Sequence, residues 1–462
     1  MKTIKEARKN IALLWHSPIP LAEGTYRPMK FLLQTPVNEG LLLYNVVTSE
    51  MVLADEVEMD FFKGSAVKYR QDMDELIARH YLVPEGFDES KSVHQLRALL
   101  KKLKPSKRVH GFTILPTTEC NARCFYCFES DHPRCTMTEQ VAADTVAYIA
   151  DICKGEPIDI TWFGGEPLVG AKRIAQICEG LRKREIQFKS SIVSNAYLFD
   201  EKLIQAAKDD WRVQLVQITL DGTEKVYNET KAYVQPKDNP YQHVLQNIEK
   251  LLDHGIAVNI RLNVTPKNAE DLSKLIDELD ARFSGKKGFS GYAHAVYEDV
   301  GFDPLSYDND MREWVDAQIS VLEAKLREKK MLSSNVKMPK LSTVHCMSDN
   351  DSTRVIYPDG TIGKCENKSS RDGIGDIYRD ISDKTNEAQY KATVDIPGCN
   401  DCPLFPSCVN LEICPETGKC SKIKLKWKFD QYIPMMKNQY QKYLLNISEN
   451  YSEETSQPEC ES

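Results

Sequence analysis

Between residues 112 and 296 the chain repeatedly alternates a short β-type run with an amphipathic helical pattern. In the pattern at 241–254, for example, Val244, Ile248 and Leu251 share one helical face. This alternation predicts a parallel sheet with right-handed crossovers, built either as a partial barrel or as a doubly wound sheet. The expected strands are 112–116, 158–163, 190–194, 213–220, 257–264 and 291–296, and the expected helices between them are 138–154, 171–183, 201–208, 241–254 and 268–282.

Three cysteines follow the first expected strand directly. Cys120, Cys124 and Cys127 form the pattern C-x3-C-x2-C. Three thiolates alone do not fill a four-ligand metal site, so the spacing indicates a centre with one position left for a ligand that is not protein. A zinc knuckle, or three loosely placed thiols, is the alternative.

Polar and glycine residues follow the later strands, at the edge where parallel sheets bind ligands. Gly164-Gly165-Glu166-Pro167 comes after the second strand, and glycines there let a backbone approach a ligand closely. Carbonyls or a carboxylate in such a segment accept hydrogen bonds from a cofactor ammonium. On the fifth strand Arg261 and Asn263 lie two apart, hence on one face, where the Arg suits a bidentate grip on a carboxylate.

A second group of seven cysteines lies in the C-terminal third, in a segment rich in Pro and loops. Such a segment contains too little apolar surface to fold without metal. Residues 357–363 predict a hairpin that brings Cys346 and Cys365 together. A zinc ribbon is the alternative, although seven cysteines fit two clusters better than one zinc site. The seven are Cys346, Cys365, Cys399, Cys402, Cys408, Cys414 and Cys420.

The first motif, with the aromatic Tyr126 before its last cysteine and Gly-Gly-Glu-Pro one strand later, resembles the signature of the radical S-adenosylmethionine (radical SAM) enzymes. In that family three thiolates hold a 4Fe-4S cluster whose fourth iron chelates the methionine part of S-adenosylmethionine. The resemblance implies that Cys120, Cys124 and Cys127 hold this cluster. It implies that the cofactor and substrate pocket is lined by Tyr126, Gly164, Gly165, Glu166, Ser194, Asn195, Asp221, Arg261 and Asn263. Ala196 departs from the Gly that many relatives carry after the Asn.

The order of the later cysteines resembles the SPASM extension of radical SAM peptide maturases, which binds two auxiliary 4Fe-4S clusters. By this resemblance Cys399, Cys402, Cys408 and Cys420 hold the outer cluster, and Cys346, Cys365 and Cys414 hold the inner one. The spacing between Cys408 and Cys414 departs from the usual one. No fourth cysteine is found for the inner cluster. Its open iron would suit a substrate thiolate, or the position is closed by His345, another residue or water.

The resemblance covers roughly residues 108–425 and implies an α/β fold with a partial (β/α)6 radical SAM barrel over 108–330. A loop-rich iron-sulfur domain is expected over 331–445, reached through a helical stretch at 307–330. Residues 446–462 are rich in Ser and Glu, and we expect them to be disordered.

Residues 1–107 predict a separate α+β module, winged-helix-like, joined to the barrel by a linker near Pro105. Its β-type runs begin near residues 29, 40 and 50, and its helical patterns cover 65–81 and 92–103. The module is either a plain cap on the barrel or a docking site where an extended peptide adds a strand to a sheet edge.

The activity that the resemblance implies is reductive cleavage of S-adenosylmethionine to a 5'-deoxyadenosyl radical, which removes hydrogen from an unactivated C–H bond. The sharpest hypothesis is a maturase that forms a thioether in a ribosomally made precursor peptide with a leader. It would take electrons from a low-potential donor such as flavodoxin or ferredoxin. Rival hypotheses are a maturase forming carbon-carbon crosslinks and an anaerobic sulfatase-type formylglycine maturase.

Composition separates these enzymes from other classes. The net charge of -8 argues against broad nucleic-acid binding, which needs a surplus of Lys and Arg. We find no secretory signal and no run of membrane-spanning length, so a cytoplasmic protein with no membrane contact is expected. Thiols stay reduced there, and cysteines indicate metal ligands more readily than disulfides. The non-enzyme alternative is a zinc-stabilised scaffold or a nucleic-acid-binding protein.

Overall fold

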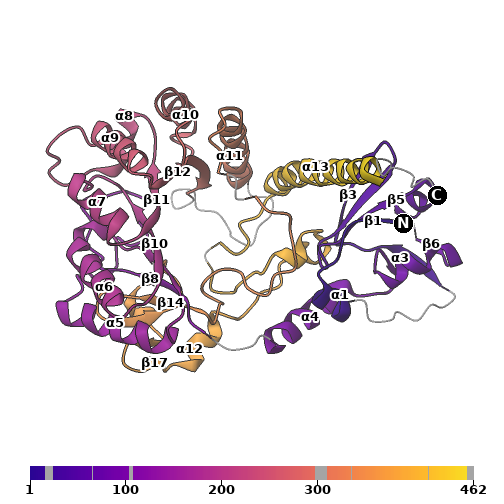
Figure 1. Ribbon diagram of the computed structural model, residues 1–462, viewed down its shortest axis with the longest axis horizontal. Coiled ribbons are helices and arrows are strands. Elements are labelled where there is room, and N and C mark those ends of the chain that lie inside the picture. The colour runs from indigo at the N-terminus through magenta and orange to yellow at the C-terminus, as the bar shows by residue number, and fades with distance from the viewer. Residues whose placement is uncertain are drawn as a thin grey trace, which may run out of the picture.

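The computed structural model describes residues 1–15, 24–64, 66–103, 108–296, 310–333, 336–414 and 416–454. Figure 1 shows three regions: a sheet covered by helices, the N-terminal module at the other end, and the C-terminal segment between them. Within the described part of the chain, no helix is both long enough and apolar enough to cross a membrane.

The central sheet contains all six strands expected from the alternation, side by side and parallel, in the order β13-β12-β11-β10-β9-β8. The prediction of an α/β fold with a six-stranded open parallel sheet is therefore confirmed. The strands are β8 (Gly111–Ile114), β9 (Ile158–Trp162), β10 (Phe188–Ser194), β11 (Val213–Leu220), β12 (Ala257–Val264) and β13 (Phe289–Ala295).

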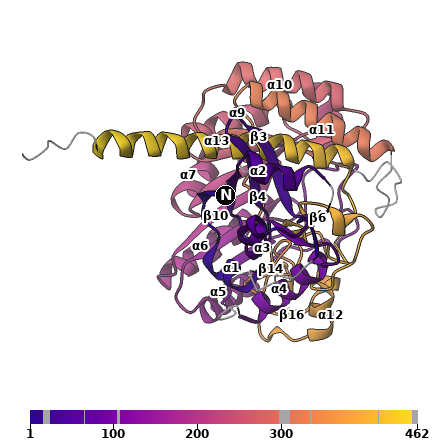
Figure 2. The same ribbon diagram turned by 90° about the vertical axis from the view of Figure 1, so that its right-hand side faces the viewer.

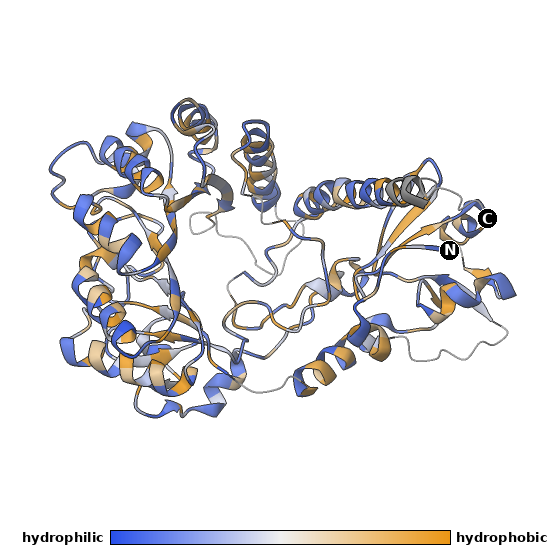
Figure 3. Cartoon of the chain, viewed as in Figure 1, coloured by the Kyte–Doolittle hydropathy of each residue, from blue (hydrophilic) through white to orange (hydrophobic). Residues whose placement is uncertain are grey.

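Helices cover one face of this sheet, and their outward faces are polar (Figure 3). Three of them begin at a capping side chain, because Thr138, Asp200 and Asn239 each accept a hydrogen bond from a backbone N–H of the first turn. The helices are α5 (Glu139–Cys153), α6 (Ala171–Lys183), α7 (Glu201–Asp209), α8 (Glu224–Lys231), α9 (Pro240–Asp253), α10 (Ala269–Phe283) and α11 (Asp310–Glu328). The sequence did not predict α8, and residues 307–309 of the helical stretch expected at 307–330 lie outside the described residues.

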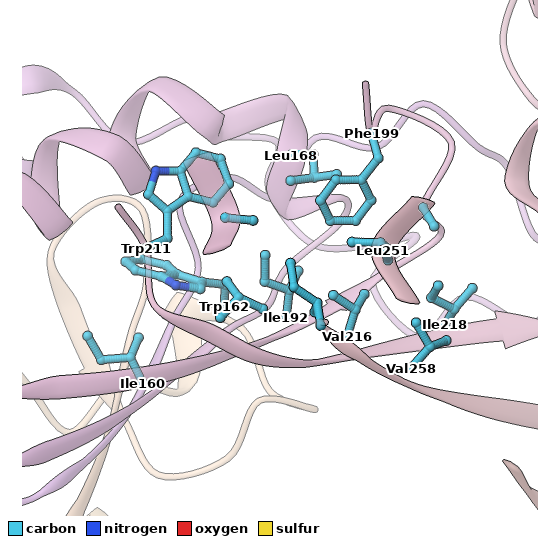
Figure 4. Close-up of a cluster of buried hydrophobic side chains, with 14 of the residues drawn as sticks. Ile160, Trp162, Leu168, Ile192, Phe199, Trp211, Val216, Ile218, Leu251 and Val258 are labelled. Carbon is cyan, nitrogen blue, oxygen red and sulfur yellow. The ribbon is translucent and has the colours of Figure 1, made fainter. Parts of the chain in front are cut away.

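The main core lies between the helices and the strands. Figure 4 shows Trp162, Ile192 and Val216 from three neighbouring strands directed toward Trp211 and Leu251. All five are at most 2% exposed. Burying side chains of this size contributes about 1.5–3 kcal/mol each, so this layer holds the strand ends in fixed register.

The hairpin expected at 357–363 is present and has a role that the sequence did not reveal. Its first strand, β14 (Thr353–Ile356), pairs in parallel with β8 and extends the barrel sheet. Its second strand, β15 (Thr361–Gly363), pairs antiparallel with β14, and the turn contains Gly360 at φ +85°. The sheet continues through β16 (Gly375–Asp376) and β17 (Asp380–Ile381), next to the short helix α12 (Lys384–Gln389).

The N-terminal module contains two small antiparallel sheets with the orders β1-β5-β4-β3 and β6-β2-β7. Its strands are β1 (Lys2–Lys5), β2 (Thr25–Pro28), β3 (Leu32–Val37), β4 (Gly40–Asn45), β5 (Met51–Ala54), β6 (Val67–Lys68) and β7 (Leu82–Pro84). Its helices are α1 (Lys9–Trp15), α2 (Glu56–Met59), α3 (Asp74–Ala78) and α4 (Glu89–Leu103). The expected helix at 92–103 is confirmed as part of α4.

The prediction of a single helix over residues 65–81 is wrong. Residue 65 is outside the described residues, Val67–Lys68 form strand β6, and the helix α3 covers only Asp74–Ala78. Strand β6 forms because β2 supplies its hydrogen-bonding partner, with Thr25 opposite Lys68. A partner this distant in sequence overrides the local helical pattern.

The last helix, α13 (Lys422–Glu454), returns to the N-terminal module and extends past the rest of the molecule (Figure 2). Its residues Met436 and Tyr440 pack with Leu33, Leu42 and Tyr44 of the module. The expectation of disorder from residue 446 is wrong as far as Glu454, because each further helical residue adds one backbone hydrogen bond to an existing helix. Residues 455–462 lie outside the described residues.

Helix α11 buries a carboxyl group against the sheet, and this makes stability depend on pH. Glu323 is 7% exposed, and burial raises its pKa to about 7. As the pH rises above about 4.5, the unfolded chain ionises this group before the folded one does, so stability falls until the pH passes 7. Glu323→Gln should therefore raise the Tm at pH 8 and change it little near pH 4.5, as measured by calorimetry. The exposed neighbour Glu328, changed to Gln, should show no such pH-dependent gain.

Candidate functional site

A cavity of about 420 Å³ opens beyond the carboxyl ends of β9, β10 and β11. All three cysteines of the first motif line it, which places them at the edge where parallel sheets bind ligands. The other walls include Tyr126, Gly164, Gly165, Glu166, Ser194 and Asn195, all expected at the pocket, together with Glu129 and Lys231, which were not.

The three thiols are partly buried and close enough to affect one another electrostatically. Burial raises the pKa of Cys120 to about 12, and the charges of Glu166, Cys124 and Cys127 add to the shift. Burial also raises the pKa of Cys127. Thiolates are the form that binds metal, and the positive charge of a bound metal centre would favour that form of Cys120 and Cys127 against the effect of burial. The donor set fits an iron-sulfur cluster with one iron left open.

Across the described ranges no three His, Cys, Asp or Glu side chains are placed to hold one metal ion. Two sulfurs on one zinc lie within about 4.6 Å, twice a Zn–S bond of about 2.3 Å. In an iron-sulfur cube each thiolate binds a different iron, so the sulfurs lie further apart.

Gly164 and Gly165 allow the loop after β9 to pack closely against the backbone of the segment that carries the cysteines. A Cβ on Gly164 would lie 2.2 Å from the Thr117 carbonyl oxygen, and Gly164 has φ +114°. A Cβ on Gly165 would lie 2.5 Å from the carbonyl oxygens of Thr118 and Glu119. These glycines therefore fix the backbone that leads into Cys120, a role additional to the expected approach of a ligand.

The carboxylate of Glu166 already accepts several hydrogen bonds from other groups of the protein. It accepts hydrogen bonds from the Ser194 hydroxyl at 2.8 Å, from the Asn195 backbone N–H at 2.8 Å and from the Leu168 N–H at 3.1 Å. Burial raises its pKa to about 7, against the effect of these donors. Glu166 thus joins the Gly-Gly-Glu-Pro loop to the end of β10, and a direct bond from it to a cofactor stays a prediction.

The turn after β10 reaches the cysteine loop. The Asn195 side-chain amide donates to the Asn121 side-chain oxygen at 2.8 Å. Ala196 has φ +62°, the left-handed conformation for which Gly is usual, so the backbone keeps its path despite the departure from the family pattern. Its N–H donates to the Ser194 hydroxyl at 2.9 Å.

Tyr126, Asp221 and Lys231 form a buried network beside the cavity. The Tyr126 hydroxyl donates to Asp221 at 2.7 Å, and the Lys231 ammonium donates to the Tyr126 oxygen at 3.1 Å and lies 3.0 Å from the Asp221 carboxylate. Burial and the Asp221 charge leave Tyr126 with a pKa well above its usual value. Asp221 is 1% exposed and does not line the cavity, although it was expected there. It contacts the cavity wall through Tyr126, whose hydroxyl it binds.

Sequence reasoning missed Lys231 because helix α8 was not predicted. Tyr227 and Lys231, four residues apart, share its buried face, and that spacing was the available signal. The loop after α8 also holds the cysteine segment, since Arg123 N–H donates to the Lys231 carbonyl and Val234 N–H donates to the Asn121 carbonyl, both at 2.8 Å.

Removing either partner of the buried Asp221–Lys231 pair should leave one uncompensated buried charge. Lys231→Met and Asp221→Asn should each lower the free energy of unfolding of the barrel by about 3–5 kcal/mol. The double variant should recover part of this loss, because neither charge remains. The urea midpoint, followed by tryptophan fluorescence, measures the effect. Lys225→Met, on the exposed face of the same helix, should change it little.

Arg261 and Asn263 do lie on one face of β12, as expected, but they do not line this cavity. The Arg261 Nε donates to the Asn263 side-chain oxygen at 2.9 Å, and its Nη2 lies 3.0 Å from Nδ1 of His294 on β13. Burial and the Arg261 charge lower the pKa of His294 to about 4. The expected grip of Arg261 on a cofactor carboxylate stays a prediction.

The seven later cysteines lie in two groups, and their role as cluster ligands stays a prediction. In one group burial and then the charge of Cys414 raise the pKa of Cys346, and the charges of Cys346 and Cys414 add to the raised pKa of Cys365. Burial raises the pKa of Cys365 to about 12. In this group the His345 Nε2 lies 3.8 Å from the Cys414 sulfur.

Cys399, Cys402, Cys408 and Cys420 form the other group, where burial and the neighbouring thiols raise the pKa of Cys402 to about 11. It lies against the N-terminal module: Arg97 of α4 donates to the carbonyl oxygens of Phe405, Pro406 and Cys408.

Residues 114–279 match the sequence model of the radical SAM superfamily. This part of the chain is a radical SAM domain. The match contains all three cysteines of the first motif and the Gly-Gly-Glu-Pro segment. The match covers only part of the chain, and it is this part, with the three cysteines, that belongs to the superfamily.

Known proteins resemble different lengths of this chain. The GTP 3',8-cyclase of Clostridium perfringens is 24% identical over 190 residues, 39% of this chain and 57% of the cyclase. The chain thus spans little more than half the length of that curated relative. The solved structure of native anSMEcpe with bound AdoMet has a TM-score of 0.54 at 17% identity, over 72% of this chain and 99% of that one. Streptococcus suis SuiB bound to S-adenosylmethionine has a TM-score of 0.50 at 14% identity, over 86% and 99%.

Proposed function

We propose that this radical SAM enzyme is a maturase that joins a Cys sulfur to a carbon atom of a ribosomally made precursor peptide, forming a thioether. When bound, the first cluster and S-adenosylmethionine supply a 5'-deoxyadenosyl radical that removes hydrogen from an unactivated C–H bond. The peptide loses one C–H and one S–H hydrogen when the C–S bond forms. The electron left over would need an acceptor, a role that clusters held by the two later cysteine groups would supply.

The observation that carries this proposal is the composition of the inner cysteine group. Cys346, Cys365 and Cys414 supply three thiols, and within the described residues the group contains no fourth cysteine. An inner 4Fe-4S cluster on these ligands has one iron open to a substrate thiolate, which would fix the sulfur that forms the new bond. Cys346 is exposed, so a peptide has access to this side of the group.

The N-terminal module supports recognition of a leader peptide. Both of its small sheets are antiparallel, and among the described residues their end strands pair on one side only: β1 and β3 in one sheet, β6 and β7 in the other. An extended leader adds to such an edge through main-chain hydrogen bonds. A fold relative supports a peptide substrate as well: anSMEcpe with bound AdoMet and the Cp18Cys peptide has a TM-score of 0.52 to this chain.

The proposal includes two auxiliary 4Fe-4S clusters, with Cys399, Cys402, Cys408 and Cys420 as a complete ligand set for the outer one. It also includes a low-potential electron donor such as flavodoxin or ferredoxin, and a cytoplasmic location where the thiols stay reduced. A carbon-carbon crosslinking maturase shares all of these parts, and only the product separates it from the thioether enzyme.

The test is anaerobic reconstitution followed by reaction with a Cys-containing precursor peptide encoded beside the gene. Three clusters correspond to about twelve irons per chain. The thioether product should be lighter by two hydrogen atoms and should lose one alkylatable thiol. A two-hydrogen loss with every thiol retained would indicate a carbon-carbon crosslink, and an aldehyde in place of the Cys would indicate a formylglycine maturase. Cyclisation of GTP without any peptide product would refute the proposal.

Cys414→Ala should retain cleavage of S-adenosylmethionine but lose the thioether product. The ratio of 5'-deoxyadenosine to thioether product should rise. Substrate carbon radicals would still form, but no sulfur would be held in place to bond with them. Cys135→Ala is the matched control, since this partly exposed thiol lies outside the three cysteine groups and should leave both yields unchanged. Full product from Cys414→Ala would remove the inner group from the mechanism.

A further inference from the structure

Five charged side chains from the described residues line the cavity beside the first three cysteines: Arg123, Glu129, Arg134, Glu166 and Lys231. Three of them are held by contacts already made within the protein. Glu166 accepts three hydrogen bonds, Lys231 is paired with Asp221, and Arg123 donates to the carbonyl oxygens of Cys120 and Ala122 at 2.7 Å. Arg134 lies 3.8 Å from the Glu119 carboxylate.

Glu129 differs from these four. Its side chain is 6% exposed, and within the described part of the chain its buried Oε1 accepts no hydrogen bond. The nearest cation candidate, Nδ1 of His132, is 4.0 Å away. Burying a carboxylate without a donor costs several kcal/mol, and a group in this state is commonly satisfied by water, an ion or a ligand.

The position of Glu129 is fixed by its own backbone. Its N–H donates to the Cys127 sulfur, and its carbonyl accepts from the His132 N–H at 3.1 Å. The Ser130 N–H donates to the Cys127 carbonyl at 3.1 Å in the same turn. Glu129 thus lines the cavity from a short, hydrogen-bonded turn that leaves the last cysteine of the motif.

We propose that Glu129 is the anionic acceptor for a donor group of S-adenosylmethionine in this cavity. The charge fits, because the cofactor carries an ammonium and a sulfonium against one carboxylate, and is net cationic. Two parts of the cofactor carry donors of the right chemistry: the ammonium of its methionine part and the hydroxyls of its ribose. A charge-assisted bond to either satisfies the one cavity carboxylate that the described residues leave unsatisfied.

Anaerobic binding of S-adenosylmethionine to the cluster-loaded protein, with no peptide present, tests this assignment. Glu129→Gln keeps the shape and removes the charge, and should raise the Kd roughly tenfold to hundredfold. Asp131→Asn, an exposed carboxylate in the same turn, is the matched control and should leave the Kd unchanged. An unchanged Kd in Glu129→Gln would overturn the proposal. The readout is cofactor affinity, so it is independent of whether the enzyme acts on a peptide.

Two fragments distinguish the donors. Methionine carries the ammonium without the ribose, and 5'-deoxyadenosine carries the ribose hydroxyls without the ammonium. If Glu129 binds the ammonium, Glu129→Gln weakens methionine binding and spares 5'-deoxyadenosine; the reverse result assigns the carboxylate to the ribose. If both fragments bind as in the unchanged protein, the proposal fails.

Iron content separates a binding defect from a damaged cysteine loop. Glu129→Gln should carry the same iron per chain and the same reduced-cluster EPR signal as the unchanged protein. Glu129→Asp is the second variant, because it retains the charge but withdraws the oxygens by one methylene, and its Kd should lie between the other two. Loss of the first cluster from both variants would show that Glu129 serves the loop alone and would overturn the proposal.

Discussion

Cys124→Ala is expected to abolish formation of 5'-deoxyadenosine from S-adenosylmethionine. Cys124 is the middle thiol of the three that line the cavity, and the loop that carries it is held by Asn195 on one side and by the segment after α8 on the other. No other described cysteine lines that cavity, so nothing replaces the missing ligand. Two thiolates would leave a 4Fe-4S cluster with two unligated irons in place of one.

The measurement is anaerobic turnover with a strong reductant, with 5'-deoxyadenosine quantified by chromatography. The variant should also lose about four irons per chain, one cluster's share, while the two later cysteine groups retain theirs. Cys135→Ala controls for the loss of a thiol near the motif and should cleave the cofactor normally. Cofactor cleavage by Cys124→Ala at an undiminished rate would refute the assignment of the first cluster to this motif.

Gly165→Ala is expected to lower cofactor cleavage by at least about 100-fold, the loss typical of a misplacement near 1 Å. The added Cβ would lie 2.5 Å from two carbonyl oxygens, those of Thr118 and Glu119. Both belong to the backbone immediately before Cys120, so relief of the clash requires the cysteine segment to move. Gly165 needs no left-handed conformation, and the expected effect therefore comes from the contact alone.

A matched control for Gly165→Ala is available in Gly86→Ala. A Cβ on Gly86 meets no atom within 4 Å, and its backbone is not left-handed. It should leave iron content and cleavage unchanged. If Gly165→Ala cleaved the cofactor as fast as the unchanged enzyme, the close packing of the two segments would not be what positions the first cluster.

The parallel sheet was predictable because its information is local. Each of its strands, and each helix from α5 to α10 except α8, carries its own periodic pattern, and short crossovers of one hand leave few ways to arrange them. The carboxyl ends of the strands then meet at one edge, which is why Cys120 and Gly164, more than 40 residues apart, were expected together.

The site was predictable only where a motif marked it. Glu129 was missed because a single Glu carries no pattern, and its burial distinguishes it only in the folded chain. Lys231 was missed because helix α8, on which its spacing from Tyr227 was the available signal, was not predicted. Arg261 and Asn263 share a face of β12 as their spacing requires, yet Arg261 is held by Asn263 and His294 away from the cavity. Alternation along a strand fixes the face of a residue but not the cavity it reaches.

The sequence by itself determined the six parallel strands and the edge that carries the first cysteines, because periodicity and motif spacing act over short stretches of chain. The division of the later cysteines into two groups came from the family resemblance. The tertiary structure alone decided that β14 joins the barrel beside β8, that α13 packs on the N-terminal module and that β6 interrupts an expected helix. In each of these cases the stabilising partner is distant in sequence. Contacts between distant segments depend on how surfaces fit in three dimensions, and no local pattern records that fit.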